Sequence, residues 1–125
     1  MKIFIADDSA PIRERLKIMI SEIPGAEIIG EAEDGVRAIA DIKELTPDIV
    51  ILDIRMAGEN GINVLKAIKK ERQPPIVMML TSYPYPQYRL KCMELGADYF
   101  FKKGTESEKV KKVIEKLISE GGTHA

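Results

Sequence analysis

The feature of this sequence that most constrains its fold is a repeated change in the spacing of its apolar residues. Short apolar runs rich in β-branched residues alternate with longer segments whose apolar residues recur every three or four positions. Apolar runs without polar alternation are typical of strands that are buried on both faces. The runs that we interpret as strands are 2–6, 27–30, 48–52, 76–80 and 98–101.

The segments between these runs have the periodicity of amphipathic helices. The first follows Ser9, a favoured N-cap residue, and has Pro11 in its first turn. The positions that mark the five helices are Ile12, Leu16, Met19, Ile20 and Ile23; Val36, Ile39 and Ala40; Ile62, Leu65 and Ile68; the segment 86–95; and Val110, Val113, Ile114, Leu117 and Ile118. The expected stop signals are Pro24-Gly25, Thr46-Pro47, Pro74-Pro75, Gly96 and Gly121-Gly122.

Five strands that alternate with five helices predict one parallel sheet with right-handed crossovers and helices on both faces. We therefore predict a three-layer α/β fold. In the strand order 2-1-3-4-5, the first and third strands are neighbours, and ligands bind beyond the carboxyl ends of the strands.

The composition narrows the function classes. Nineteen Lys and Arg against twenty Asp and Glu argue against direct nucleic-acid binding. The single cysteine, Cys92, can form neither an internal disulfide nor a thiolate cluster, which favours a reducing compartment. The longest apolar run, 76–80, is far shorter than the ~20 residues of a membrane span, and acidic residues interrupt any signal peptide. We therefore expect a cytoplasmic protein without a membrane segment.

Chemically useful residues follow the predicted strands. They are Asp7 and Asp8 after the first strand, Asp53 after the third, Thr81 and Ser82 after the fourth, and Lys102 and Lys103 after the fifth. Three neighbouring carboxylates repel one another unless a cation joins them, and Mg²⁺, with Mn²⁺ as an alternative, suits oxygen ligands of this kind. Lys103 adds a positive charge that can pair with a phosphoryl group. The set therefore predicts phosphoryl transfer onto a carboxylate.

Other interpretations of single residues remain open at this point. A lone aspartate after a strand is most often a helix cap or turn residue, and Asp34 before Gly35 is such a case. Phosphate-binding glycine loops, dinucleotide fingerprints and nucleophile elbows are missing from the sequence. The only histidine, His124, lies in the tail, so we expect no acid–base histidine.

These residues resemble the receiver domain of two-component response regulators, in particular the stand-alone chemotaxis-type form. The resemblance covers residues 2–120. It rests on Asp7-Asp8, on Asp53 within the run 50–56, on Gly61, on the triplet Leu80-Thr81-Ser82 and on the segment 96–103. It implies a flavodoxin-like doubly wound sheet of order 2-1-3-4-5, a receiver domain at 1–120 and a C-terminal tail at 121–125.

The resemblance also implies a role for each site residue. The implied roles are phosphoacceptor for Asp53; Mg²⁺ ligands for Asp7, Asp8, Asp53 and the backbone carbonyl of Arg55; phosphoryl contact and switch for Thr81; phosphoryl pairing for Lys103; a rotamer switch for Phe100; and control of the acyl-phosphate lifetime for Arg55 and Tyr83. The receiver lysine follows the glycine of the Gly-Ala-Asp run by seven residues, which selects Lys103 and not Lys102. The same register selects Phe100 and not Tyr99.

The implied partners are a histidine kinase or a phosphotransfer protein as phosphodonor, and a separate output protein. That output protein would contact the face of the fourth helix, fifth strand and fifth helix. The resemblance implies no conventional enzyme, because the domain catalyses only its own phosphorylation and dephosphorylation. Two departures affect the switch: Ala57 and Gly104 stand where receivers commonly have proline.

Three alternatives stay open on the sequence. The alternatives to a stand-alone phosphorylated receiver are a fragment of a longer DNA-binding response regulator, a metal-dependent phosphatase, and a structural receiver that is never phosphorylated. Two further features have simple interpretations. The tyrosines of residues 83–88 are expected to pack over the start of the fourth helix, with a surface for a partner as the alternative. We expect Cys92 to be a small buried residue of that helix.

Overall fold

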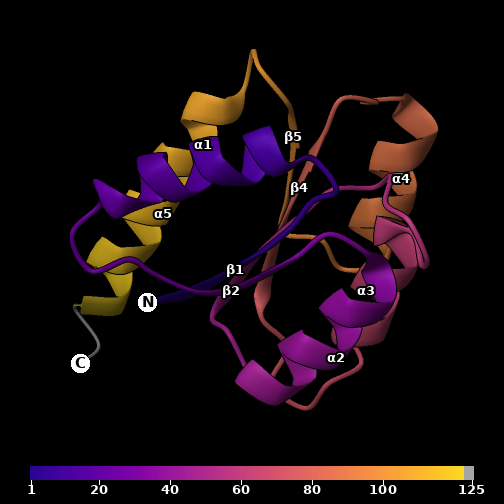
Figure 1. Ribbon diagram of the computed structural model, residues 1–125, viewed down its shortest axis with the longest axis horizontal. Helices are drawn as coiled ribbons and strands as arrows, with labels where there is room; N and C mark the ends of the chain where they lie inside the picture. Colours follow the sequence, from indigo (N-terminus) through magenta and orange to yellow (C-terminus); the bar gives the residue numbers. More distant parts are fainter. Residues whose placement is uncertain (123–125) are drawn as a thin grey trace.

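The computed structural model describes residues 1–122, so His124 lies outside the described residues. Strands and helices alternate along the whole of this range (Figure 1). The elements are β1 (Lys2–Ala6), α1 (Ala10–Ser21), β2 (Glu27–Ala32), α2 (Gly35–Leu45), β3 (Ile49–Leu52), α3 (Gly61–Ile68), β4 (Ile76–Thr81), α4 (Pro86–Glu94), β5 (Tyr99–Lys102) and α5 (Ser107–Gly122).

The five strands form one parallel sheet in the order β2-β1-β3-β4-β5, which confirms the predicted order. Helices α1 and α5 cover one face of the sheet, and α2, α3 and α4 cover the other (Figure 1). Each face has its own apolar core, because strand side chains alternate between the two faces. On β4, Met78 packs into the α1/α5 core and Met79 into the core under the other three helices.

Three of the helices begin at a side-chain cap, which explains where they start. The hydroxyl of Ser9 accepts a hydrogen bond from the Ile12 amide at 3.4 Å. The carboxylate of Asp34 accepts one from the Arg37 amide at 2.8 Å, so this aspartate is a helix cap as predicted. Asn60 caps α3 in the same way.

The buried stripe of α2 differs from the prediction. Val36 is 65% exposed and Ala40 is also exposed, whereas Ala38 and Ile42 are buried. The cause is the start of this helix, where the Gly35 amide donates to the Ala57 carbonyl at 3.1 Å. A side chain on Gly35 would overlap the Glu59 carbonyl oxygen. This close contact fixes the rotation of α2 about its axis, so the residues three and seven positions after Gly35 face the core.

Several element ends also differ from the prediction, most of them by one residue. Strand β2 continues to Ala32, two residues beyond the predicted end, and α5 includes both of the glycines that were expected to stop it. Cys92 is fully buried in α4, as predicted, and burial raises the pKa of its thiol to about 11. Within residues 1–122 the helices lack the combination of length and apolar character that crossing a membrane requires.

Candidate functional site

The candidate site is built around Asp53, at the residue directly after β3. Its amide donates to the Ala6 carbonyl at 2.9 Å, which aligns the ends of β3 and β1. The residue is only 5% exposed, and its Oδ1 accepts a hydrogen bond from the Ile54 amide at 2.8 Å. The following loop returns to the strand end, where the Gly61 amide donates to the Ile54 carbonyl at 2.7 Å. Gly61 is required there because a Cβ would overlap the carbonyl oxygen of Asp53.

The two other carboxylates come from the end of β1. Asp7 is 2% exposed and Asp8 is exposed, so the pair presents one buried and one solvent-facing acid. Each of Asp7, Asp8 and Asp53 offers a carboxylate oxygen within 4.8 Å of the other two. A group of oxygen ligands with one side open to water fits a hard cation such as Mg²⁺, which keeps some of its waters when bound.

Lys103 joins the two buried carboxylates of this cluster. Its Nζ lies 2.8 Å from Oδ2 of Asp7 and 2.9 Å from Oδ2 of Asp53, and its side chain is 12% exposed. The lysine is brought there by the end of β5, since its amide donates to the Thr81 carbonyl on β4 at 2.8 Å. Lys102 is exposed instead, so the structure brings the lysine selected by the register into the site.

The pKa values of Asp53 and Lys103 depend on their burial and on the contact between them. Burial raises the pKa of the Asp53 carboxyl to about 6, the bond from Lys103 opposes this change, and the neighbouring charge of Asp7 adds to it. Burial alone would lower the pKa of Lys103, but its hydrogen bonds to Asp7 and Asp53 outweigh that effect and raise it. At neutral pH the site therefore holds a charged lysine beside a carboxylate that is held in its ionised form against the cost of burial.

Two further residues flank the pocket above Asp53. The guanidinium of Arg55 lies over the ring of Tyr83, 3.9 Å from its centroid, so a cation–π contact joins the loops after β3 and β4. The pocket has a volume of about 460 Å³ and is lined by Asp8, Ser9, Ile12, Arg15, Asp53, Arg55, Ser82, Tyr83, Lys103 and Gly104. Tyr83 and Tyr85 of the loop after β4 contact each other with ring centroids 6.2 Å apart, and Tyr85 contacts Tyr88 of α4 at 5.5 Å.

Thr81 of β4 and Phe100 of β5 are the two predicted switch residues, and both are buried. Thr81 is fully buried, and its hydroxyl accepts a hydrogen bond from the Tyr83 amide at 3.0 Å, which leaves the hydroxyl proton free to donate. Phe100 is 4% exposed and packs on the α4 side of the sheet. The Arg89 guanidinium covers its ring at 4.9 Å and donates to its carbonyl at 3.3 Å. Tyr99 packs on the opposite face.

The family model of the response regulator receiver domain matches residues 3–115. The chain belongs to this family. Among solved structures, the response regulator domain of Thermotoga maritima CheB aligns at 30% identity with a TM-score of 0.83, over 96% of this chain and 94% of that one. A structure titled as the CheX-CheY-BeF3-Mg+2 complex from Borrelia burgdorferi aligns at 28% identity with a TM-score of 0.85, over 95% of this chain and 88% of that one.

The curated relatives are longer proteins. The transcriptional regulatory protein YdfI of Bacillus subtilis is 36% identical over 117 residues, which is 94% of this chain and 54% of YdfI. A protein-glutamate methylesterase/protein-glutamine glutaminase of Pyrococcus horikoshii is 33% identical over 95% of this chain and 33% of its own length. The receiver chain thus spans between a third and about half of the length of these relatives.

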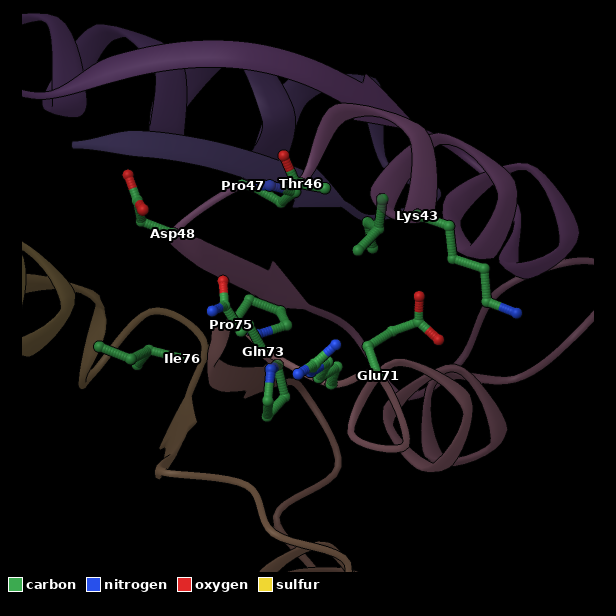
Figure 2. A pocket seen from close by; sticks show the side chains of 11 residues that line it. Lys43, Thr46, Pro47, Asp48, Glu71, Gln73, Pro75 and Ile76 are labelled. Carbon is green, nitrogen blue, oxygen red and sulfur yellow. The ribbon is translucent and has the colours of Figure 1, made fainter.

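The receiver also has a larger pocket, of about 530 Å³, at the opposite edge of the sheet (Figure 2). Its lining residues include Asp48, just before β3, and Ile76, the first residue of β4. Figure 2 shows Asp48 apart from Lys43 and Glu71, so these charges do not meet at one point. The Asp48 carboxylate instead accepts the Lys2 amide at 2.7 Å. The smaller pocket, where Lys103 meets Asp53, is therefore the candidate site.

One residue beside the receiver site was missed by the sequence reasoning. Arg13 of α1 donates from Nη1 to the Asp7 carbonyl at 2.7 Å. The available signal was weak, because a single arginine in the first turns of a helix is ordinarily a solvated side chain.

Proposed function

We propose that this receiver accepts a phosphoryl group on Asp53 from a histidine kinase or a phosphotransfer protein in a step that needs Mg²⁺. The modified domain then changes conformation and controls a partner. The observation that carries the proposal is the buried contact of one ammonium group with both Asp7 and Asp53, beside a third carboxylate. Such a group of charges is costly to bury, and phosphoryl transfer is a chemistry that uses it.

The proposed reaction starts with the ionised carboxylate of Asp53. One of its oxygens attacks the phosphorus of the donor, the new O–P bond forms, and the bond from phosphorus to the donor nitrogen breaks, so the donor histidine leaves with the electron pair. Lys103 neutralises charge on the transferred phosphoryl oxygens, and the Thr81 hydroxyl donates to one of them. Water later attacks the phosphorus and releases inorganic phosphate, which restores the carboxylate.

The metal requirement rests on the donor set. Asp7, Asp8 and Asp53 would hold Mg²⁺, together with the carbonyl of Arg55, and Mn²⁺ is the alternative ion. When bound, such an ion would supply positive charge that offsets the negative charge of the phosphoryl oxygens. The residues fit it because their carboxylate oxygens cluster within 4.8 Å and one of the three acids is exposed.

Arg55 and Tyr83 are proposed to set the lifetime of the acyl phosphate. They line the pocket together and are joined by the cation–π contact at 3.9 Å, so they limit the path of water to Asp53. Removal of either side chain is expected to change the rate of dephosphorylation and not the identity of the modified residue.

The proposed output is a rearrangement on the face formed by α4, β5 and α5. Thr81 would move toward the phosphoryl group and Phe100 would change rotamer with it, against the contact that Arg89 makes with its ring. A separate output protein would bind this face.

Three other expectations also stay predictions: the cytoplasmic location, the stand-alone arrangement and the receiver boundary at residue 120. One of the relatives is a transcriptional regulator, so the alternative of a fragment of a DNA-binding response regulator stays open.

The test uses the purified chain with acetyl phosphate and MgCl₂, followed by intact-mass spectrometry. Wild type is expected to gain one acid-labile phosphoryl group, which should not form when EDTA replaces MgCl₂, and Asp53→Asn is expected to gain none. Asp48→Asn, at the other edge of the sheet, serves as the matched control and should be modified like wild type. Incorporation into Asp53→Asn would contradict the assignment of the acceptor. Turnover of an external phosphoester would instead favour a phosphatase, and a chain that binds no Mg²⁺ and takes up no phosphate would be a structural receiver.

A further inference from the structure

Arg13 lies between α1 and the turn that carries the acidic pair. Its Nη1 donates to the Asp7 carbonyl at 2.7 Å, and its Nε donates to Oε1 of Glu31 on β2 at 2.9 Å. The side chain is only 14% exposed. One planar guanidinium therefore connects the end of β1 to β2 through two donors whose directions are fixed relative to each other.

The carbonyl that Arg13 holds belongs to the peptide that joins Asp7 to Asp8. Because a peptide group is planar, a fixed carbonyl oxygen also fixes the direction in which the chain enters Asp8. The rest of Asp7 is held by other groups: its amide donates to the Ala32 carbonyl at 3.0 Å, and its Oδ1 accepts from the Ser9 amide at 2.9 Å. Asp8 itself is exposed, so the held peptide restrains the backbone that places its carboxylate.

The second carboxylate oxygen of Glu31 is also in an ion pair. Oε2 of Glu31 lies 2.7 Å from Nζ of Lys17, and the same Nζ lies 2.7 Å from Oε1 of Glu14. The hydrogen bond from Lys17 lowers the pKa of Glu31, against the effect of burial and with the help of Arg13, so Glu31 stays ionised at neutral pH. Charges of opposite sign thus alternate along this network, and Arg13 is the member that contacts the acidic turn.

We propose that Arg13 is a positioning residue for the carboxylates of Asp7 and Asp8 and that it sets the affinity of the site for a divalent cation. This inference rests on the proposed function, because it assigns those carboxylates to Mg²⁺. Geometry and charge predict opposite results for its removal. Loss of a positive charge near three acids would tighten cation binding by Coulomb attraction, whereas loss of the restraint would weaken it.

The experiment measures Mg²⁺ binding to the full chain by isothermal titration calorimetry for wild type, Arg13→Met, Arg13→Lys and Lys17→Met. Arg13→Met is expected to weaken Mg²⁺ binding about tenfold, which is a typical loss when a group that orients metal ligands is removed. Arg13→Lys keeps the charge but lacks the two-donor fork, so its affinity should fall between those of wild type and Arg13→Met. Lys17→Met removes a charge from Glu31 without touching Asp7 and should bind like wild type.

Thermal unfolding in EDTA accompanies each titration, so that loss of fold is separated from loss of affinity. If Arg13→Met does not fold, Arg13→Lys decides the matter. Affinity that is unchanged or tighter in a folded Arg13 variant overturns the positioning role, and so does a loss of equal size in Lys17→Met. Wild type that binds no Mg²⁺ overturns the metal requirement of the proposed function itself, which the wild-type titration shows separately.

Discussion

The two edges of the sheet both have a pocket and charged side chains, but they arrange them differently. At the carboxyl edge, Lys103 contacts Asp7 and Asp53 within 2.9 Å, in a pocket of about 460 Å³. At the amino edge, the pocket of about 530 Å³ is larger, and Asp48 lies apart from Lys43 and Glu71 (Figure 2). The arrangement of the charges at the two edges, and not the size of the two pockets, is therefore why we propose the carboxyl edge as the functional one.

The strongest test of this contrast is the removal of one lysine from each edge. Lys103→Met is expected to slow phosphoryl incorporation from acetyl phosphate about 100-fold, since it removes a charge that stabilises the transferred group. Lys43→Met at the amino edge should leave the rate unchanged. Initial rates from intact-mass spectra at fixed MgCl₂ measure both variants. Equal rates for wild type and Lys103→Met would show that the ammonium group does not serve the transfer.

The second test concerns how tightly the carboxyl edge is packed. Gly61→Ala is expected to lower the free energy of unfolding by about 3 kcal/mol, because the new Cβ would meet the rigid backbone at Asp53. Gly104 offers a matched control, since its φ is +82° but a Cβ added there would meet no atom of residues 1–122 beyond its chain neighbours within 4 Å. Gly104→Ala should cost about 1 kcal/mol, from its backbone conformation alone. Urea unfolding followed by circular dichroism compares the two, and similar losses would contradict the close approach at Gly61.

The smallest expected effect is a pH-dependent gain in stability. The pKa of Asp53 is about 6 in the folded chain against an ordinary value of 3.8, so the folded state holds this proton more tightly than the unfolded state. The contribution of Asp53 to stability is therefore fully present below about pH 4 and is lost as the pH rises through about 6. At pH 8 in EDTA, Asp53→Asn should raise the free energy of unfolding by about 2 kcal/mol.

At pH 4 this gain should vanish, which makes the pH series its own control. Asp48→Asn at the amino edge should stay within about 0.5 kcal/mol of wild type at both pH values. Denaturant titrations at the two pH values provide the measurement. If Asp53→Asn destabilised the chain at pH 8, burial would not be the main influence on this carboxyl group.

The sequence predicted most of the fold because the strands at the centre of the sheet have a clear pattern. Runs such as 49–52 and 76–80 carry no polar residues, and only a sheet covered on both faces buries such runs so fully. The site followed from the same pattern, since parallel strands end at one edge and therefore bring Asp7, Asp53 and Lys103 together. These three residues are far apart in the sequence, and the parallel arrangement of the strands brings them close together.

The features that were missed depend on contacts between distant segments. The rotation of α2 is set where Gly35 meets the backbone of residues 57–59, so Val36 lies outside although its apolar character predicts burial. The role of Arg13 depends on Glu31, which reaches it only because β2 pairs with β1. Side-chain chemistry alone does not distinguish either residue from its neighbours.

Cys92 has a practical consequence. It is the single cysteine of the chain, it is fully buried on the inner side of α4, and burial raises the pKa of its thiol to about 11. We therefore expect a thiol reagent to reach it only when α4 leaves the sheet. The rate at which Cys92 is labelled therefore reports how often α4 opens, without an engineered probe. A cysteine introduced at an exposed position would also react first, which allows site-specific labelling with the native thiol left in place.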